Sequence, residues 1–313
     1  MKKTAFVYPG QGSQYVGMGK DLSDNFATAK KMFEEADKTL GRGISALCFN
    51  GPMEDLTRTI NTQPAIYIVS MVINMILKEK GVDFQAAAGH SLGEYAAAAS
   101  SGIFDYSTGL SLVDSRAKFM DECAVGKKGS MAAVLGMTPA AVGEVCASVT
   151  ADNSRVVPAN INCPGQIVVS GDADAVARFI EAAKAAGARK VVPLPVSGAW
   201  HSYHMDGASV KMSALLDTVN FSAPEKSVYF NYHGKTESSP AAFKDLMKKQ
   251  MLGAVLWEEI VSNMIADGVE VFVEAGPGKV LTGLIKKINK DAIVFNVTTA
   301  AEIEAFLTAF AAL

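Results

Sequence analysis

Two glycines flank a serine in the segment Gly89-His90-Ser91-Leu92-Gly93, and this arrangement can expose a nucleophile. A strand-like run at residues 84–88 precedes the segment, and an alanine-rich helical run follows it. A serine at such a sharp turn needs neighbours without side chains, and the helix N-terminus directs N–H groups at developing negative charge. Ser91 is therefore a candidate nucleophile. The alternative is a glycine-bounded loop in which Ser91 only caps the helix.

A serine hydroxyl becomes a useful nucleophile only beside a base, and the sequence has four histidines. His90 precedes Ser91 on the same turn, where adjacent side chains diverge. His201 lies in the small-residue stretch 197–202, after a strand-like run, where a loop can deliver a side chain to a cleft. His201 is the better candidate base, although any one histidine is more often a surface or satisfied core residue.

Arg116 is the cation with the most unusual surroundings. It lies on a predicted helix at residues 106–123, among the apolar residues Leu112, Val113, Phe119 and Met120. An unpaired buried guanidinium is costly, so Arg116 either extends to water or meets an anion. Without further information a partly exposed surface arginine is the simpler interpretation.

A glycine-rich loop, residues 10–14, follows the first strand-like run at residues 4–8. It does not fit a dinucleotide-binding fingerprint, because the third glycine is Gly17 and no acidic residue ends an obvious second strand. Glycines at this position allow backbone N–H groups to approach an active site. The alternative is an ordinary strand-to-helix turn.

Strand-like and helical runs alternate along the chain, which indicates an α/β fold. We predict a larger, hydrolase-like α/β catalytic domain with a parallel sheet, made of residues 1–125 and 196–313. Its expected elements are strands at 4–8, 84–88, 228–231 and 269–274, one helical face across 22–40, a helix that begins at Pro64, a helix at 106–123 and a helix that ends near residue 289.

Residues 126–195 have a different pattern and predict a small subdomain. Their order of strand, helix, strand, helix, strand fits a ferredoxin-like α+β insert. The expected strands are 131–135, 166–170 and 190–194, and the expected helices are 138–148 and 173–186.

Composition excludes several classes of protein. The net charge of −3 over 313 residues argues against a nucleic-acid binder, which normally has a clustered basic surface. The four cysteines form no C-x-x-C pair, so we expect reduced thiols, no metal site and a cytoplasmic location. The longest apolar run, residues 66–77, contains Ser70 and Asn74 and is too short to cross a bilayer, so it predicts a buried helix rather than a membrane segment.

Together these segments resemble the malonyl-CoA:acyl carrier protein transacylase family, and the resemblance spans nearly the whole chain. The matching motifs, in chain order, are Gly10-Gln11-Gly12-Ser13-Gln14, Gln63-Pro64-Ala65-Ile66, Gly89-His90-Ser91-Leu92-Gly93-Glu94, Arg116 with Met120, Gly198-Ala199-Trp200-His201-Ser202, Gln250 with Val255-x-Trp257, and Gly276-Pro277-Gly278. The chain departs from the family at Trp200, where phenylalanine is usual, and at Ala117, where glycine is common.

The resemblance implies a role for each matching residue. Ser91 attacks the thioester, and His201 accepts its proton while a backbone carbonyl near Gln250, rather than an aspartate, orients the imidazole. The N–H groups of Gln11 and Leu92 form the oxyanion hole, and Arg116 grips the malonyl carboxylate. Three further residues belong to the acyl pocket or help to orient the histidine, and these are Trp200, Met120 and His90.

The resemblance also implies the reactants. Malonyl-CoA is the donor substrate and acyl carrier protein is the acceptor, with no cofactor and no metal. We expect a monomer that binds neither nucleic acid nor membrane. The basic pairs Arg189-Lys190 and Lys286-Lys287 are candidates for local attraction to an acidic carrier protein, although such pairs are usually only solvated.

Four other functions make different demands on the sequence. An ordinary α/β-hydrolase should have a histidine near the C-terminus and an HGGG-like loop, but the last histidine here is His233. A thioesterase that removes wrongly loaded acyl groups should not need a cation such as Arg116. A trans-acting acyltransferase of a polyketide pathway would share all the motifs. A carrier-protein-binding module with a dead site should lack Ser91 or His201.

Overall fold

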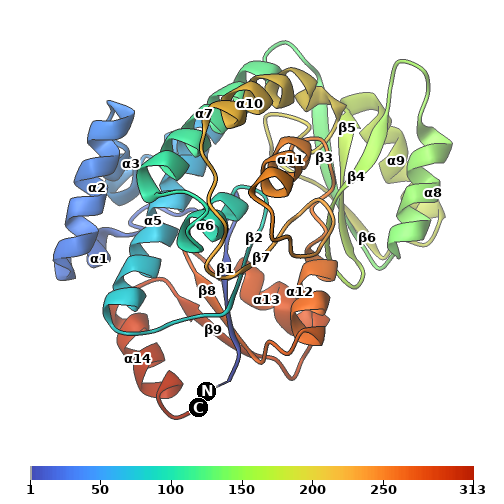
Figure 1. The fold of residues 1–313 in the computed structure, drawn as a ribbon. Coiled ribbons are helices and arrows are strands. Elements are labelled where there is room, and N and C mark those ends of the chain that lie inside the picture. Colours follow the sequence, from blue (N-terminus) through green and yellow to red (C-terminus); the bar gives the residue numbers. More distant parts are fainter. Residues whose placement is uncertain (1) are drawn as a thin grey trace.

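Two β-sheets form the framework of the protein, and the computed structural model describes residues 2–313 (Figure 1). The larger sheet has the strand order β7-β2-β1-β8-β9, and all neighbouring pairs are parallel. Its strands are β1 (Thr4–Tyr8), β2 (Ala86–Gly89), β7 (Ser227–Tyr229), β8 (Val271–Ala275) and β9 (Ile293–Val297). Because the strands are parallel, their carboxyl ends and the loops that follow them meet at one edge of the sheet.

Each face of the large sheet has its own apolar core. Along β1, Phe6 and Tyr8 belong to one core, and Ala5 and Val7 belong to the other. The helices over the first face include α2 (Ala27–Leu40), α5 (Thr59–Glu79), α6 (Gly93–Ser100), α7 (Tyr106–Ala124) and α10 (Asp206–Thr218). The helices over the second face are α12 (Trp257–Ala266) and α13 (Val280–Ile288). A parallel sheet covered on both faces confirms the predicted α/β fold.

Shorter helices complete the larger lobe. They are α1 (Lys20–Asn25), α3 (Ile44–Asn50), α4 (Met53–Thr57), the 3₁₀ turn η1 (Tyr203–Met205), α11 (Pro240–Gln250) and α14 (Ala300–Phe310). The single helical face predicted across residues 22–40 was wrong, because Phe26 is extended at φ −127° and ψ 120° and separates α1 from α2. The Phe26 side chain is half-buried against the main core, so packing explains the break.

Helix α5 begins at Thr59, so the prediction that Pro64 begins it was wrong. A proline inside a helix cannot donate to the carbonyl four residues earlier, which here belongs to Ile60. Arg42 Nη2 donates to that Ile60 oxygen at 2.8 Å. A side chain from outside the helix therefore satisfies the acceptor that Pro64 leaves free, and the helix continues through the proline.

The apolar segment of α5 passes through the core of the protein. By length and composition the helix could cross a membrane, but 83% of its apolar 18-residue window is buried inside the fold. The prediction that residues 66–77 form a buried helix is confirmed.

The smaller sheet is antiparallel and has the strand order β4-β5-β3-β6. Its chain order is β3 (Gly129–Leu135), α8 (Pro139–Val149), β4 (Val156–Cys163), β5 (Gln166–Asp172), α9 (Ala173–Ala185) and β6 (Lys190–Pro193), which is the ferredoxin-like order. Strand β4 was missed from the sequence, because Pro158, Asn160 and Asn162 interrupt its apolar pattern. It is an edge strand with register shifts, the position where a sheet tolerates proline.

The small sheet lies beside the larger lobe (Figure 1). At the end of β5, Asp172 accepts hydrogen bonds from Tyr203 Oη and from His204 Nε2, the latter at 2.8 Å. Both donors follow His201 closely in the chain, so the small sheet holds one side of the histidine loop. All strands of the small sheet fall between Gly129 and Pro193. The domain limits at residues 126 and 195 stay a prediction.

Candidate active site

Ser91 lies in a tight turn between β2, which ends at Gly89, and α6, which begins at Gly93. Its φ of 53° is in the left-handed region that non-glycine residues seldom adopt. Both flanking positions require glycine, because a side chain at either one would collide with nearby backbone atoms. A Cβ on Gly89 would lie 1.8 Å from the Gly93 carbonyl carbon, and one on Gly93 would lie 2.2 Å from the Tyr8 oxygen. The turn therefore fits closely between its own strand, its own helix and the end of β1.

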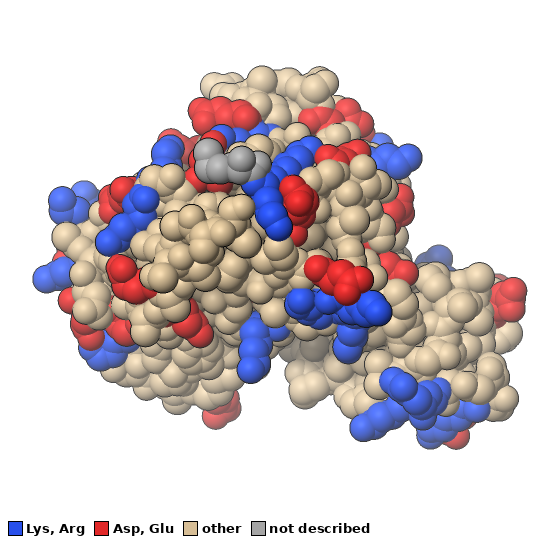
Figure 2. All heavy atoms as spheres, turned by 90° about the horizontal axis from the view of Figure 1, so that it is seen from below, with Lys and Arg blue, Asp and Glu red and all other residues tan. Residues whose placement is uncertain are grey.

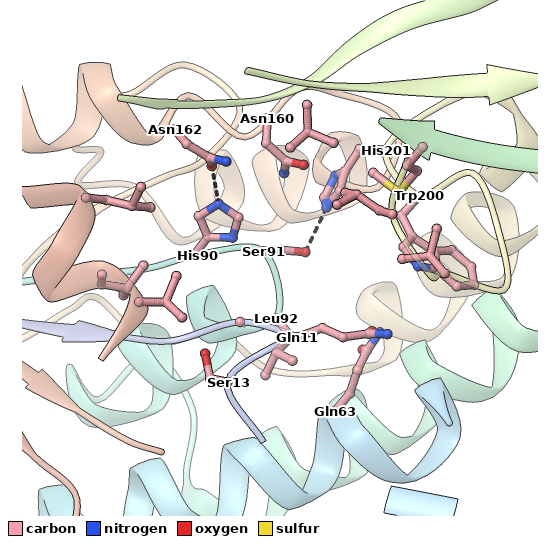
Figure 3. A pocket seen from close by; sticks show the side chains of 18 of the residues that line it. Gln11, Ser13, Gln63, His90, Ser91, Leu92, Asn160, Asn162, Trp200 and His201 are labelled. Atoms are coloured by element: carbon pink, nitrogen blue, oxygen red, sulfur yellow. Dashed lines mark hydrogen bonds between the residues drawn. The ribbon is translucent and has the colours of Figure 1, made fainter. Parts of the chain in front are cut away.

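Ser91 and His201 are in direct contact, with Ser91 Oγ 2.7 Å from His201 Nε2 (Figure 3). The other ring nitrogen, Nδ1, lies 3.1 Å from the backbone oxygens of Gln250 and of Gly253. Because both oxygens only accept, Nδ1 must carry the proton, and Nε2 is left to accept the serine hydroxyl. The sequence alone had favoured His201, and the structure brings it to Ser91.

The imidazole is neutral in this environment. His201 is 4% exposed, and burial, followed by the positive charge of Arg116, lowers its pKa to about 3. The neutral form is the one that can accept a proton from a serine. His201 also has a positive φ, 57°, so both members of the pair are held in sparsely populated backbone conformations.

Arg116 is buried beside the serine. It is 1% exposed, so the alternative of a partly exposed surface arginine is wrong. Its Nη2 donates to Ser91 Oγ at 3.0 Å and to Gln250 Oε1 at 3.1 Å, and its Nη1 donates to Gln63 Oε1 at 2.7 Å. Within residues 2–313 no carboxylate lies within 4.0 Å of the guanidinium, and its Nε has no acceptor. The pocket therefore contains a buried cation with unused capacity to bind an anion.

Gln250 joins these three residues. Its Oε1 accepts from Arg116, its Nε2 donates to the Ser91 backbone oxygen at 2.7 Å, and its own backbone oxygen faces His201 Nδ1. The expected carbonyl near Gln250 is in the expected place, and the side chain adds contacts that the sequence did not indicate.

Gln11 and Leu92, whose backbone N–H groups are the predicted oxyanion donors, both line the same pocket (Figure 3). The loop that carries Gln11 packs tightly on the serine turn, since a Cβ on Gly10 would lie 2.6 Å from the His90 oxygen. In the part of the chain that the structure describes, neither N–H has a protein acceptor. Two free donors next to a nucleophile can stabilise an oxyanion.

Other predicted pocket residues lie around this centre. Trp200 is 6% exposed and lines the pocket, and the sulfur of Met120 accepts from Gln63 Nε2 at 3.3 Å. His90 turns away from the serine, and its Nε2 lies 2.9 Å from Asn162 Oδ1 (Figure 3). His90 therefore shapes the wall of the pocket.

Several residues of the pocket were not predicted as site residues. Asn160 and Asn162 come from β4, and Gln166 and Val168 come from β5, so the pocket lies between the small sheet and the larger lobe. No sequence signal pointed to the two asparagines, because β4 itself was not recognised. Among the described residues no group of His, Cys, Asp and Glu could hold a metal ion.

Comparison with known proteins shows the family of this chain. Residues 5–304 match the family model of the acyl transferase domain. The chain belongs to this family. It is 42% identical to the malonyl CoA-acyl carrier protein transacylase of Bacillus subtilis, over 93% of this chain and 92% of the relative.

Solved structures of related acyltransferases have the same fold. An acyl carrier protein S-malonyltransferase from Vibrio cholerae has a TM-score of 0.94 at 39% identity, covering 97% of this chain and 99% of its own. A malonyl-transacylase solved with its type II polyketide synthase acyl-carrier protein has a TM-score of 0.95 at 37% identity, covering 98% of this chain and 100% of its own.

Because the turn fits so closely, we expect Gly93→Ala to lower both stability and activity. The new Cβ would lie 2.2 Å from the Tyr8 oxygen and 2.9 Å from the Pro9 oxygen, so β1 and α6 must move apart. We expect a loss of about 1–3 kcal/mol in the free energy of unfolding, measured with urea, together with loss of acyl transfer. The matched control is Gly143→Ala in α8, where a Cβ meets nothing within 4 Å. Equal stability of the two variants would contradict the tight approach.

Proposed function

We propose that this acyltransferase moves a malonyl group from malonyl-CoA to the phosphopantetheine thiol of an acyl carrier protein, through an ester on Ser91. The observation that carries the proposal is the buried Arg116, whose guanidinium touches the serine oxygen and has no carboxylate partner among the described residues. A malonyl group is the acyl unit that would place a carboxylate there. The names of relatives at 37–42% identity support the same substrate pair.

In the first half-reaction His201 Nε2 accepts the hydroxyl proton while Ser91 Oγ attacks the thioester carbonyl. The carbonyl oxygen becomes negative and receives hydrogen bonds from the N–H groups of Gln11 and Leu92. The carbon–sulfur bond then breaks, and the leaving thiolate takes the proton from His201. One positioned base typically contributes about 10²–10⁴ in rate, and one oxyanion donor about 2.7–4 kcal/mol.

The second half-reaction runs through the same groups in reverse. His201 accepts the proton of the carrier-protein thiol, the sulfur attacks the malonyl ester, and Ser91 Oγ leaves and recovers its proton. Because one site serves both steps, we expect ping-pong kinetics. Serine, imidazole, guanidinium and backbone N–H groups supply all the chemistry, so the proposed reaction needs no cofactor.

Selection of the acyl group follows from the charge of Arg116. A planar guanidinium can hold a carboxylate through two parallel hydrogen bonds. An acetyl group would leave the buried charge without an anion, at a cost of about 3–5 kcal/mol. Gln63 and Gln250 hold the guanidinium in place before the substrate arrives, which lowers the entropy cost of binding.

The route for the thiol arm lies between the two lobes. The hollow there has Lys and Arg side chains along it (Figure 2). Lys287 Nζ donates to Gln166 Oε1 at 3.0 Å, and Gln166 lines the pocket. Lys286 and Lys287 are both exposed, so we propose that they attract the acidic carrier protein at the mouth of the pocket.

The pathway that the protein serves, its location and its oligomeric state are part of the proposal. The match to a malonyl-transacylase solved with a type II polyketide synthase carrier protein supports a polyketide pathway as the second candidate beside fatty acid biosynthesis. We further propose a cytoplasmic monomer that binds neither membrane nor nucleic acid, since the long apolar helix α5, the one found within residues 2–313, is buried and the net charge is −3.

The ester on Ser91 is the first prediction of this mechanism. Intact mass spectrometry of the protein mixed with malonyl-CoA should show one added malonyl group, and Ser91→Ala should show none. His201→Ala should form the adduct slowly, because only the base is missing. A malonyl adduct on Ser91→Ala would identify a different nucleophile, and rapid release of free malonate by the native protein would favour a thioesterase.

Arg116→Ala should change the choice of acyl group. We expect malonyl transfer to fall relative to acetyl transfer by roughly 150- to 5,000-fold, the equivalent of about 3–5 kcal/mol. Arg116→Lys keeps the charge but not the planar fork, so its preference should be intermediate. The measurement is kcat/KM for both thioesters with one carrier protein. A malonyl preference that survives in Arg116→Ala would refute the carboxylate role.

Reversal of charge at Lys286 and Lys287 tests carrier-protein docking. The double change to Glu should raise KM for the carrier protein, most strongly at low salt, while KM for malonyl-CoA changes less. The matched control reverses the exposed pair Lys30 and Lys31 on α2, which alters the net charge equally. The same rise in both variants would mean that net charge alone, and not a docking face, controls the encounter.

A further inference from the structure

Ser91 is in a backbone conformation that requires support. Its φ of 53° costs about 1–2 kcal/mol for a residue with a Cβ. Such a conformation persists only when the surroundings impose it. The flanking glycines make the turn possible, but they do not select it over other turns.

Two amide side chains hold the Ser91 backbone from opposite sides. The Ser91 N–H donates to Asn231 Oδ1 at 2.7 Å, and the Ser91 carbonyl accepts from Gln250 Nε2 at 2.7 Å. Asn231 Nδ2 also donates to the Gly89 oxygen at 2.7 Å. One amide therefore bridges the last residue of β2 and the nucleophile.

The position of Asn231 explains this bridge. Strands β2 and β7 pair in parallel with Ala88 opposite Tyr229, and Asn231 follows two residues after the end of the pairing. Its side chain supplies one donor and one acceptor where backbone pairing has stopped. The hydrogen-bond ladder of the sheet is thereby continued by a side chain up to Ser91.

A buried carboxylate in turn holds Asn231. Glu94 Oε2 accepts the Asn231 N–H at 2.6 Å, across 137 positions of sequence. Glu94 is 1% exposed, and its Oε1 has no partner in residues 2–313. Burial raises the pKa of Glu94 to about 7. A buried acid with no cation within 4.0 Å in the described chain is costly, so the residue needs a gain that offsets this cost.

We infer that Glu94 and Asn231 are positioning residues that lock Ser91 in its left-handed turn, a role that rests on Ser91 being the proposed nucleophile. Neither residue lines the pocket. They act through the backbone of Ser91, with Glu94 fixing the main chain of Asn231 and Asn231 fixing the serine. We call these two linked hydrogen bonds the relay, and the orientation of the Ser91 hydroxyl toward His201 depends on it.

The test compares variants that keep or remove each hydrogen bond. Asn231→Ala should lower kcat about 100-fold, the effect of a small misplacement of a reacting group, with little change in KM for malonyl-CoA. Glu94→Ala should lower kcat in the same way, and Glu94→Gln should restore most of it, because its amide oxygen can still accept the Asn231 N–H. The Glu94→Ala, Asn231→Ala double variant should fall no further than Asn231→Ala.

A second measurement, which needs no malonyl substrate, tests this inference separately from the proposed function. The rate at which a fluorophosphonate probe modifies Ser91, located by mass spectrometry, reports the aim of the hydroxyl without any malonyl group. Slow labelling of the variants beside rapid labelling of the native protein supports the relay, even if malonyl transfer fails in every protein.

Asn74→Ala removes another buried asparagine, whose Oδ1 accepts from Tyr8 Oη at 3.0 Å, and should cost stability without slowing the labelling of Ser91. If Asn231→Ala does not fold, Asn231→Leu replaces it, since leucine has a similar volume but can neither accept from the Ser91 N–H nor donate to the Gly89 oxygen. Native labelling and kcat in folded Asn231→Ala or Asn231→Leu, or equal losses in Glu94→Gln and Glu94→Ala, would overturn the inference.

Discussion

Gln250 fixes the distances among the nucleophile, the base and the cation. Its side-chain amide donates to the Ser91 backbone and accepts from Arg116, while its backbone oxygen faces the Nδ1 proton of His201. These contacts come from one residue at the end of α11, so a shift of that helix end moves all of them together. The site is therefore a single rigid unit rather than three side chains positioned independently.

In the proposed mechanism the buried positive charge of Arg116 affects both the choice of acyl group and the basicity of His201. It would bind the malonyl carboxylate, and it is the second cause, after burial, of the lowered pKa of His201. A substrate carboxylate bound to Arg116 offsets that charge and raises the affinity of the imidazole for a proton. An acyl group without a carboxylate leaves the base weaker. Selection then acts on the chemical step as well as on binding.

The sequence predicts contacts that are local, or that use distinctive residue types. The turn at Ser91 could be predicted because the residues that must lack side chains, Gly89 and Gly93, lie within five positions of each other. They also stand between a strand-like and a helical run, which marks the place of the turn. The parallel sheet follows from alternating patterns. The break at Phe26 and the helix through Pro64 depend on packing and on Arg42, which are tertiary contacts outside the local pattern.

The relay through Glu94 and Asn231 could not be predicted for the same reason. The Asn231 amide has to arrive beside Ser91 from the next strand of the sheet, and the sequence separation is 140 residues. Glu94 lies in the first turn of α6, where an acidic residue is explained locally by the helix dipole. Only the folded structure reveals that its carboxylate leaves its own helix.

The positive charge of Arg116 also explains why uncharged backbone carbonyls, rather than a carboxylate, face Nδ1 of His201. An aspartate at Nδ1 would orient the imidazole equally well, but it would place a carboxylate close to Arg116 in addition to that of the malonyl group. Coulomb attraction would then draw the guanidinium toward that carboxylate, and the malonyl group would have to compete with it. Backbone oxygens of Gln250 and Gly253 select the same tautomer with no net charge. The proposed selection of a substrate anion by the buried Arg116 is therefore compatible with a histidine held by carbonyls, and the buried acid Glu94 accepts the Asn231 N–H.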